Sequence, residues 1–86
     1  MTIYFTAAFK KKADKLSKKQ EKLPTQLKKQ FKLFQQNPTH LDLRLHKLRG
    51  KRTEQYAIWV LDDLRALAIK EGDTYIFFDL VTHDEY

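Results

Sequence analysis

The chain has 86 residues, no cysteine, a formal net charge of +6 and 42% hydrophobic residues. This length fits one domain spanning residues 1–86, and the hydrophobic content is too high for a disordered chain. The lack of cysteine excludes disulfides and thiolate metal sites. Because no apolar run approaches the roughly 18 residues of a membrane span and the N-terminal residues lack a signal-peptide pattern, we expect a cytoplasmic protein that does not enter a membrane.

Positive charge is concentrated in the first part of the chain. Residues 10–32 contain ten lysines and two acids, and residues 44–52 contain five basic side chains and no acid. From residue 53 onward the balance reverses, with eight acids and two bases. This distribution predicts a polyanionic partner such as a nucleic acid, an anionic membrane surface or an acidic protein, and the alternative is an ordinary solvated helix surface.

The N-terminal residues predict a short strand followed by a helix. Residues 3–5 are β-formers. Thr6 is a suitable N-cap for the helix. Phe9, Ala13 and Leu16 then lie at helical spacing along one face, with lysines around the rest of the surface.

A second helix is predicted to follow at once. Pro24 fits its first turn, and Asn37–Pro38 ends it because a residue before proline avoids helical angles. Leu27, Phe31 and Phe34 form its apolar stripe. The short connection predicts an antiparallel hairpin with a shared packing target, which must be a sheet because neither helix is hydrophobic enough to be stable alone.

Residues 39–53 have the least regular pattern. Leucines alternate with polar residues over 41–45, which is compatible with extended structure. Residues 46–52 then form a dense basic cluster. With His40 and His46 nearby, this cluster favours contact with phosphate, and the alternative is an ordinary polar loop.

The last third predicts three consecutive strands, residues 56–61, 64–69 and 75–81, joined by short breaks at Asp62–Asp63 and residues 71–73. With the preceding elements they predict an α+β fold. The expected architecture is a small twisted antiparallel sheet in β-α-α-β-β-β order, with a two-helix hairpin packed on one face.

The turn lengths determine which residues face each other. A two-residue first turn pairs Leu61 with Leu64 and Trp59 with Ala66, and a three-residue second turn pairs Arg65 with Asp79. In this register one face of the sheet is wholly apolar and suits helix packing. The predicted packing face consists of Ala57, Trp59, Leu61, Leu64, Ala66, Ala68, Ile76, Phe78 and Leu80.

The opposite face then carries Arg65 and His83 together, along with Tyr56 and Ile58. A two-residue second turn at Gly72–Asp73 would instead place Arg65 and His83 on opposite faces. We prefer the three-residue turn because it keeps every polar residue off the packing face.

An arginine and a histidine on one face can serve phosphodiester chemistry. Histidine titrates near pH 6.5 and transfers protons near neutrality, and arginine offers a fork of donors to a phosphate. In RNA the 2′-hydroxyl is an internal nucleophile, so we expect no metal and no cofactor; the histidines also lack metal-ligand spacing. The alternative is that His83 is an ordinary surface residue and Arg65 pairs with Asp79.

The order of elements and three motifs resemble the RelE/ParE superfamily of toxins from toxin–antitoxin pairs. The motifs are His46–Gly50, with the sequence HKLRG, Asp63–Arg65 at the start of a strand, and Thr82–Tyr86, with the sequence THDEY. The last is similar to the ending of the RelE-like and YafQ-like messenger RNA interferase branch. The resemblance covers nearly the whole chain.

The resemblance implies the toxin of a type II pair, a metal-independent, ribosome-dependent endoribonuclease that cleaves messenger RNA by 2′-hydroxyl attack and inhibits translation. A cognate antitoxin would bind it in a hetero-oligomer, in a groove that accepts apolar and acidic residues, and the lysine-rich helices would contact ribosomal RNA. The implied catalytic residues are Arg65, His83 and Tyr86. The predicted RNA contacts are His46, Lys47, Arg49, Lys51, Arg52 and Tyr56.

Two other functions remain open at this point: a non-enzymatic ParE-like toxin that inhibits DNA gyrase, and a basic RNA-binding module without chemistry. Tyr56 and Ile58 resemble the strand positions where RelE itself carries lysines. If this chain binds the same substrate, positive charge must therefore come from other residues.

Overall fold

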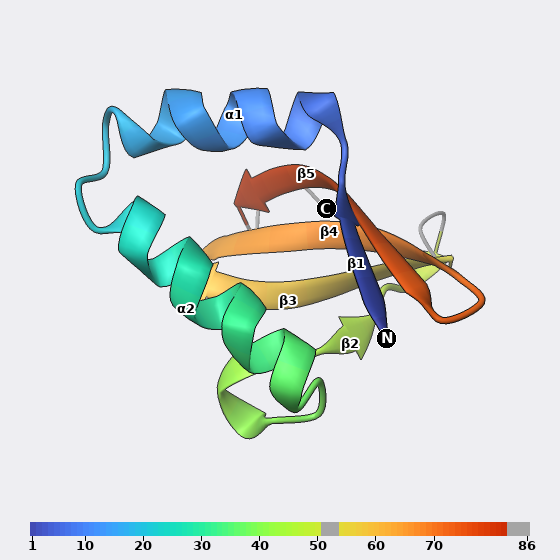
Figure 1. Cartoon of the computed structure of the whole chain (residues 1–86). Helices are drawn as coiled ribbons and strands as arrows, with labels where there is room; N and C mark the ends of the chain where they lie inside the picture. The colour runs from blue at the N-terminus through green and yellow to red at the C-terminus, as the bar shows by residue number, and fades with distance from the viewer. Residues whose placement is uncertain (51–53, 83–86) are drawn as a thin grey trace.

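The computed structural model describes residues 1–50 and 54–82, which form a five-stranded sheet with two helices over one face (Figure 1). The elements in chain order are β1 (Thr2–Phe5), α1 (Ala7–Ser17), α2 (Leu23–Gln36), the 3-10 helix η1 (Leu41–Leu43), β2 (His46–Lys47), β3 (Gln55–Leu61), β4 (Leu64–Glu71) and β5 (Thr74–Thr82). The predicted α+β class, with helices packed on one face of the sheet, is confirmed.

The strand order is β1-β5-β4-β3-β2. The neighbours from β5 to β2 pair antiparallel, whereas β1 pairs parallel with β5. Figure 1 shows β1 beside β5, the two strands nearest the ends of the chain. The sheet is therefore mixed rather than wholly antiparallel, because the long connection through both helices permits parallel pairing. The short strand β2 was not predicted.

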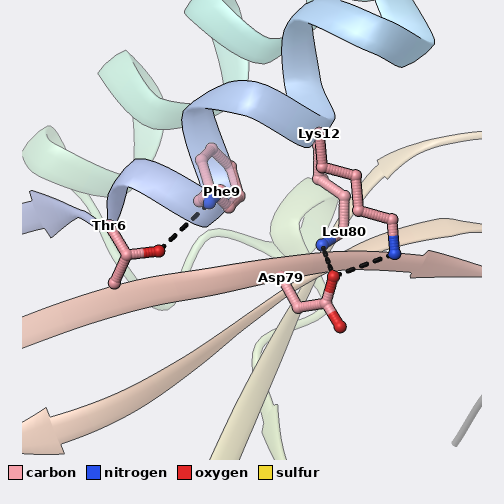
Figure 2. Close-up of polar contacts among 5 residues, drawn as sticks. All are labelled: Thr6, Phe9, Lys12, Asp79 and Leu80. Atoms are coloured by element: carbon pink, nitrogen blue, oxygen red, sulfur yellow. Dashed lines mark hydrogen bonds and ion pairs between the residues drawn. The ribbon is translucent and has the colours of Figure 1, made fainter.

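Both helices begin at the predicted signals, and α2 also ends at its predicted signal. The backbone N–H of Phe9 donates to the Thr6 hydroxyl oxygen at 3.1 Å and caps α1 (Figure 2). Pro24 lies in the first turn of α2, and Asn37 follows its last residue. The caps follow from local chemistry alone, since each needs only a side chain within one turn of the helix end.

Phenylalanines hold the helices against the sheet. Phe31 of α2 packs edge-on against Phe5 of β1 and Phe77 of β5, with ring centroids 4.8 and 4.7 Å apart. Phe9 of α1 and Phe34 of α2 are buried in the same core cluster. Aromatic rings bury large areas and prefer such edge-to-face contacts, so this cluster connects both helices to the two strands at one end of the sheet order.

The pairing of β3 with β4 differs from the predicted register. Leu61 faces Leu64 across the two-residue turn, as predicted, but Trp59 faces Arg65 rather than Ala66. The register shifts between Trp59 and Leu61, where β3 contains a bulge. A bulge inserts one extra residue and so exchanges the faces of all residues beyond it.

The bulge changes which residues of β3 face the helices. Ile58 and Val60 are buried in the core beneath the helices, whereas Ala57 is buried in a second cluster on the other face. Trp59 lies two positions from Ala57 and faces Arg65, so it shares that other face. The predicted placement of Ala57 and Trp59 against the helices is therefore wrong.

The second turn has two residues rather than three, since Glu71 faces Thr74 across Gly72–Asp73. Gly72 has φ of +58°, a left-handed conformation that suits glycine in a tight hairpin turn. A register shift opposite Leu67 and Ala68 leaves Phe78 of β5 without a partner in β4. This bulge, rather than a longer turn, switches which side chains of β5 face the helices.

As a result, Arg65 faces Val81, and Asp79 faces Leu67. The core residues of β5 beneath the helices are Tyr75, Phe77 and Leu80, so the predicted packing positions of Ile76 and Phe78 are wrong, while that of Leu80 is confirmed. His83 lies outside the described residues.

Residues 41–45 are not extended. Leu41–Leu43 form η1, where His40 Nδ1 accepts from the Asp42 N–H at 3.1 Å. Leu43 is fully buried, whereas the Leu41 side chain is 89% exposed. Arg44 follows with φ of +51° and leads the chain into β2. The alternating leucines were misleading because they lie in η1 and the residues after it: Leu43 and Leu45 pack in or against the core, whereas Leu41 is exposed.

The sheet face away from the helices, called the open face below, has its own small apolar cluster. Leu48, Ala57, Leu67 and Val81 are buried there, with Phe78 packed against them. Leu48 comes from the basic segment, and its backbone N–H donates to the Gln55 carbonyl oxygen at 2.9 Å. This leucine holds the segment that contains His46 and Arg49 against the sheet.

Candidate functional site

Arg65 lies in β4 on the open face, between Trp59 of β3 and Val81 of β5. Its side chain is half-buried. The guanidinium Nη1 donates to the backbone oxygens of Asp62 and Leu64 at 3.4 and 3.3 Å. No carboxylate among the described residues forms an ion pair with Arg65. Since a guanidinium has five N–H donors and the hydrogen bonds to described residues come from Nη1 alone, donors remain that could bind an anion.

The predicted alternative, an ion pair between Arg65 and Asp79, is wrong. Asp79 Oδ1 accepts from Lys12 Nζ at 2.9 Å and from the Leu80 backbone N–H at 2.9 Å (Figure 2). The carboxylate is thus paired with a lysine of α1. This arrangement leaves the positive charge of Arg65 uncompensated by its strand neighbour.

Two residues that were not predicted as site residues extend the site from Arg65: Trp59, which faces Arg65, and Arg44, which contacts Trp59. The Trp59 indole N–H donates to the Asp62 carbonyl oxygen at 2.7 Å, and the Arg44 guanidinium carbon lies 4.8 Å from the centre of the Trp59 ring. Arg44 is exposed and Trp59 is half-buried. Arg44 therefore lies over the indole ring, while Arg65 faces Trp59 from β4 and donates to the same Asp62 oxygen as the indole N–H, so the three residues form a row. We call it the Arg–Trp–Arg row.

His46 lies next to this row. It is exposed in β2 and faces Ala57, an open-face residue. Its Nδ1 lies 2.8 Å from the Arg44 carbonyl oxygen, which orients the imidazole. Of the predicted RNA contacts in the described residues, His46 is therefore on the same face as Arg65.

Lys47 and Tyr56 lie differently. They face each other across β2 and β3. Because neighbouring residues of a strand point to opposite faces and His46 is on the open face, Lys47 and Tyr56 lie on the helix side of the sheet. Tyr56 is packed against the core, with its ring 5.8 Å from that of Tyr75 in an edge-on contact. The predicted placement of Tyr56 beside Arg65 is wrong. Lys47 is exposed at the edge strand.

Arg49 is exposed directly after the buried Leu48. Among the remaining predicted site residues, Lys51 and Arg52 of the basic segment and His83 and Tyr86 of the C-terminal motif lie outside the described residues. Within residues 1–50 and 54–82, no cluster of three or more His, Asp or Glu side chains could hold a metal ion. No helix in the same residues is long and apolar enough to cross a membrane.

Two hollows lie on the helices. One, of about 460 Å³, lies along α1 on the side where Lys12 pairs with Asp79 of β5; it is lined by Ala8, Lys11, Lys12, Lys15, Leu16 and Lys19. The other, called the helix groove below, has a volume of about 360 Å³. It is lined by Phe5, Phe9, Lys10, Ala13, Asp14, Leu27, Lys28 and Phe31. The first hollow is rich in lysine, and the second is lined mostly by apolar side chains, with Lys10, Lys28 and Asp14 as its charged residues.

Comparison with solved structures finds the same fold in bacterial toxins. YafQ from E. coli BL21(DE3) superimposes with a TM-score of 0.75 at 21% identity, over 96% of this chain and 93% of YafQ. A YoeB/ParE toxin from Agrobacterium tumefaciens gives 0.76 at 9% identity, over 96% and 99%. YafQ in the E. coli DinJ–YafQ toxin–antitoxin complex gives 0.71 at 22% identity, over 96% and 92%. No family model and no curated protein matches the sequence.

Proposed function

We propose that this chain, which has the fold of the YafQ and YoeB/ParE toxins, is the toxin of a type II toxin–antitoxin pair. We propose further that it is a ribosome-dependent messenger RNA endonuclease acting in the cytoplasm. The observation that carries the proposal is the position of Arg65, a guanidinium without a carboxylate partner among the described residues, on the open face of this fold. A polyanion is the natural ligand for such a group.

In the proposed mechanism the substrate supplies the nucleophile. The 2′-hydroxyl gives its proton to a general base and attacks the adjacent phosphorus atom, which forms a 2′,3′-cyclic phosphate; the bond to the 5′-oxygen of the next nucleotide breaks, and a general acid protonates that oxygen. Arg65 stabilises the extra negative charge on the phosphate oxygens. His83 and Tyr86 of the THDEY motif are proposed as the proton-transfer and aromatic residues. His46, Lys47, Arg49, Lys51 and Arg52 are proposed as RNA contacts, together with the lysines of α1.

Tyr56 does not enter this mechanism. Its ring is packed against the core beneath the helices, and we therefore assign it no role in the mechanism. Its contact with RNA stays a prediction from the sequence. The charge that lysines provide at the matching strand positions of RelE is here assigned to Arg44, which lies over the Trp59 ring, and to Arg65, which faces Trp59 across the strands.

The proposed partner is a cognate antitoxin bound at the helix groove. The apolar lining that includes Phe9 and Phe31, together with Lys10 and Lys28, fits a segment that carries both apolar residues and acids. The net charge of +6 also favours an acidic partner. The DinJ–YafQ complex, formed by a protein of the same fold, supports an antitoxin as the partner. If binding of the antitoxin did not weaken with rising salt, the electrostatic part of this proposal would be wrong.

The test is a cleavage assay with ribosomes programmed with a message and analysed by primer extension. We expect the wild type to cut, Arg65→Ala to cut roughly 100- to 1000-fold more slowly because a group that stabilises transition-state charge is lost, and His83→Ala to cut roughly 100- to 10,000-fold more slowly because a proton-transfer group is lost. Lys70→Ala is the matched control, because it removes a cation from the opposite end of β4, where Lys70 lies over the Tyr75 ring. Its cleavage rate should equal that of the wild type.

Two results would refute the nuclease. One is a folded Arg65→Ala variant that cuts as fast as the wild type. The other is a wild type that never cuts the message. In the second case, inhibition of purified DNA gyrase by the same preparation would favour the ParE-like function, for which the similarity to the YoeB/ParE toxin of Agrobacterium tumefaciens is the supporting observation.

A further inference from the structure

The Arg–Trp–Arg row has an unusual composition for the surface of a small sheet. Trp59 is the one tryptophan of the chain, and a fully apolar position beneath the helices was expected for it. Instead it is half-buried on the open face, with its indole N–H bonded to the Asp62 carbonyl oxygen and its ring beside Arg44. Its polar edge is satisfied by backbone, so the ring has a defined orientation.

A buried glutamine fixes the positions of Trp59 and Arg44. Gln30 of α2 is only 1% exposed, and its Nε2 donates to the carbonyl oxygens of Trp59 at 2.9 Å and Asp42 at 3.4 Å. A buried amide is costly unless it is hydrogen-bonded, so these contacts constrain both carbonyls. The first belongs to Trp59 itself, and the second lies two residues before Arg44. Gln30 thereby connects α2 to both members of the pair.

The electrostatics of the row match a nucleotide. Arg44 lies over the indole ring, Arg65 faces Trp59 across the neighbouring strand, and neither forms an ion pair with any carboxylate of the described residues. A guanidinium stacked on an aromatic ring offers a flat cationic surface to a base, and free N–H donors bind phosphate oxygens. An acidic peptide would use the two charges but not the flat surface between them.

We propose that Arg44, Trp59 and Arg65 form a subsite for one nucleotide of single-stranded RNA. The base stacks on the Arg44–Trp59 pair, and the adjoining phosphate accepts hydrogen bonds from Arg65. Gln30 is a positioning residue, since it acts through the backbone of Trp59 and the turn before Arg44. This inference rests on the proposed function in that it identifies how the proposed nuclease holds its substrate.

The fluorescence of Trp59 tests the subsite directly, because no other tryptophan contributes to the emission. The full-length protein without ribosomes is titrated with a short single-stranded oligoribonucleotide whose 2′-hydroxyls are methylated, so that it cannot be cut. We expect saturable quenching, since a base that stacks on or beside the indole changes its emission. Inorganic pyrophosphate, which has charge but no base, should leave the emission unchanged.

Variants separate stacking from charge. Arg44→Ala should weaken oligonucleotide binding about tenfold, and Arg44→Lys, which keeps the charge but not the flat guanidinium, should fall between it and the wild type. For Trp59→Phe, binding is followed by the anisotropy of a labelled oligonucleotide and should weaken several-fold. Lys70→Ala is the control and should change the affinity by less than about twofold.

Gln30→Met tests the positioning role, because methionine has a similar volume and no N–H donor. The variant should shift the Trp59 emission maximum and weaken oligonucleotide binding, while Gln35→Ala on the exposed side of α2 does neither. Circular dichroism establishes that each variant is folded. If Gln30→Met does not fold, the Arg44 and Trp59 variants still decide the proposal.

Several outcomes would overturn the subsite. Oligonucleotide binding detected by anisotropy with no change in Trp59 emission would place the RNA elsewhere on the protein. The absence of any oligonucleotide binding would also refute the subsite. Quenching by an acidic peptide but not by RNA would assign the row to a protein partner. The failure of the subsite is distinguishable from that of the nuclease: quenching without ribosomal cleavage refutes only the nuclease, and cleavage without quenching refutes only the subsite.

Discussion

Lys12 of α1 and Asp79 of β5 form an ion pair of 2.9 Å between the first helix and the last described strand (Figure 2). Asp79 is an acid on a strand next to that of Arg65, and it accepts instead from the helix lysine and from the backbone of Leu80. The pair therefore joins α1 to β5, the second strand of the sheet, and Asp79 is not available to neutralise Arg65.

This ion pair should contribute little to stability. Both side chains are about one-third exposed (36% and 35%), so water screens their attraction. A double-mutant cycle with Lys12→Met and Asp79→Asn, measured by urea unfolding, should give a coupling free energy of about 0.2–1 kcal/mol. Coupling well above this range would mean that the pair is more strongly desolvated than its exposure indicates.

Gln30 should contribute much more. Gln30→Met leaves the carbonyl oxygens of Trp59 and Asp42 without their side-chain donor, and we expect a loss of about 1–3 kcal/mol in the free energy of unfolding. Gln35 is the matched control, because it lies on the same helix and bonds the Met1 carbonyl oxygen while exposed. Gln35→Ala should change stability by less than about 0.5 kcal/mol. Equal effects of the two variants would contradict the assigned role of Gln30.

The phenylalanine core should dominate stability. Phe34 is fully buried and packs edge-on against Tyr75 and Phe77, with centroids 4.9 and 5.6 Å apart. Phe34→Ala should lower the free energy of unfolding by about 3–5 kcal/mol, a large part of the total for a small domain. Leu41→Ala, at a side chain 89% exposed, should be nearly neutral. Thermal unfolding of both variants provides the comparison.

The turn between β4 and β5 gives a conformational prediction. Gly72 has φ of +58°, and a Cβ atom there would have no atom within 4 Å, so the cost of substitution is strain and not collision. Gly72→Ala should destabilise by about 1 kcal/mol, and Gly72→Asn by less, because asparagine tolerates the left-handed conformation. If alanine and asparagine proved equally tolerated in urea unfolding, the two-residue turn would be in doubt.

Local signals were sufficient for much of the fold. The Thr6 cap, the proline in the first turn of α2 and the end of α2 at Asn37 were predicted and are confirmed, because each depends on chemistry within one helical turn. The sequence by itself also determined the α+β class and placed Arg65 on a strand. The basic segment was correctly located before the strands, and its His46 proves to lie on the face of Arg65.

Only the tertiary structure decided which face of the sheet each strand residue occupies. In β3, Ala57, Ile58, Trp59 and Val60 are all apolar, so alternation carried no information about the buried side. The two bulges, in β3 and β5, determine which side chains beyond them face the helices. Bulges arise from the fit of whole strands against helices and neighbouring strands. The Arg–Trp–Arg row depends on that fit, together with a glutamine whose burial no local pattern indicates, since its partners are carbonyl groups far away in the sequence.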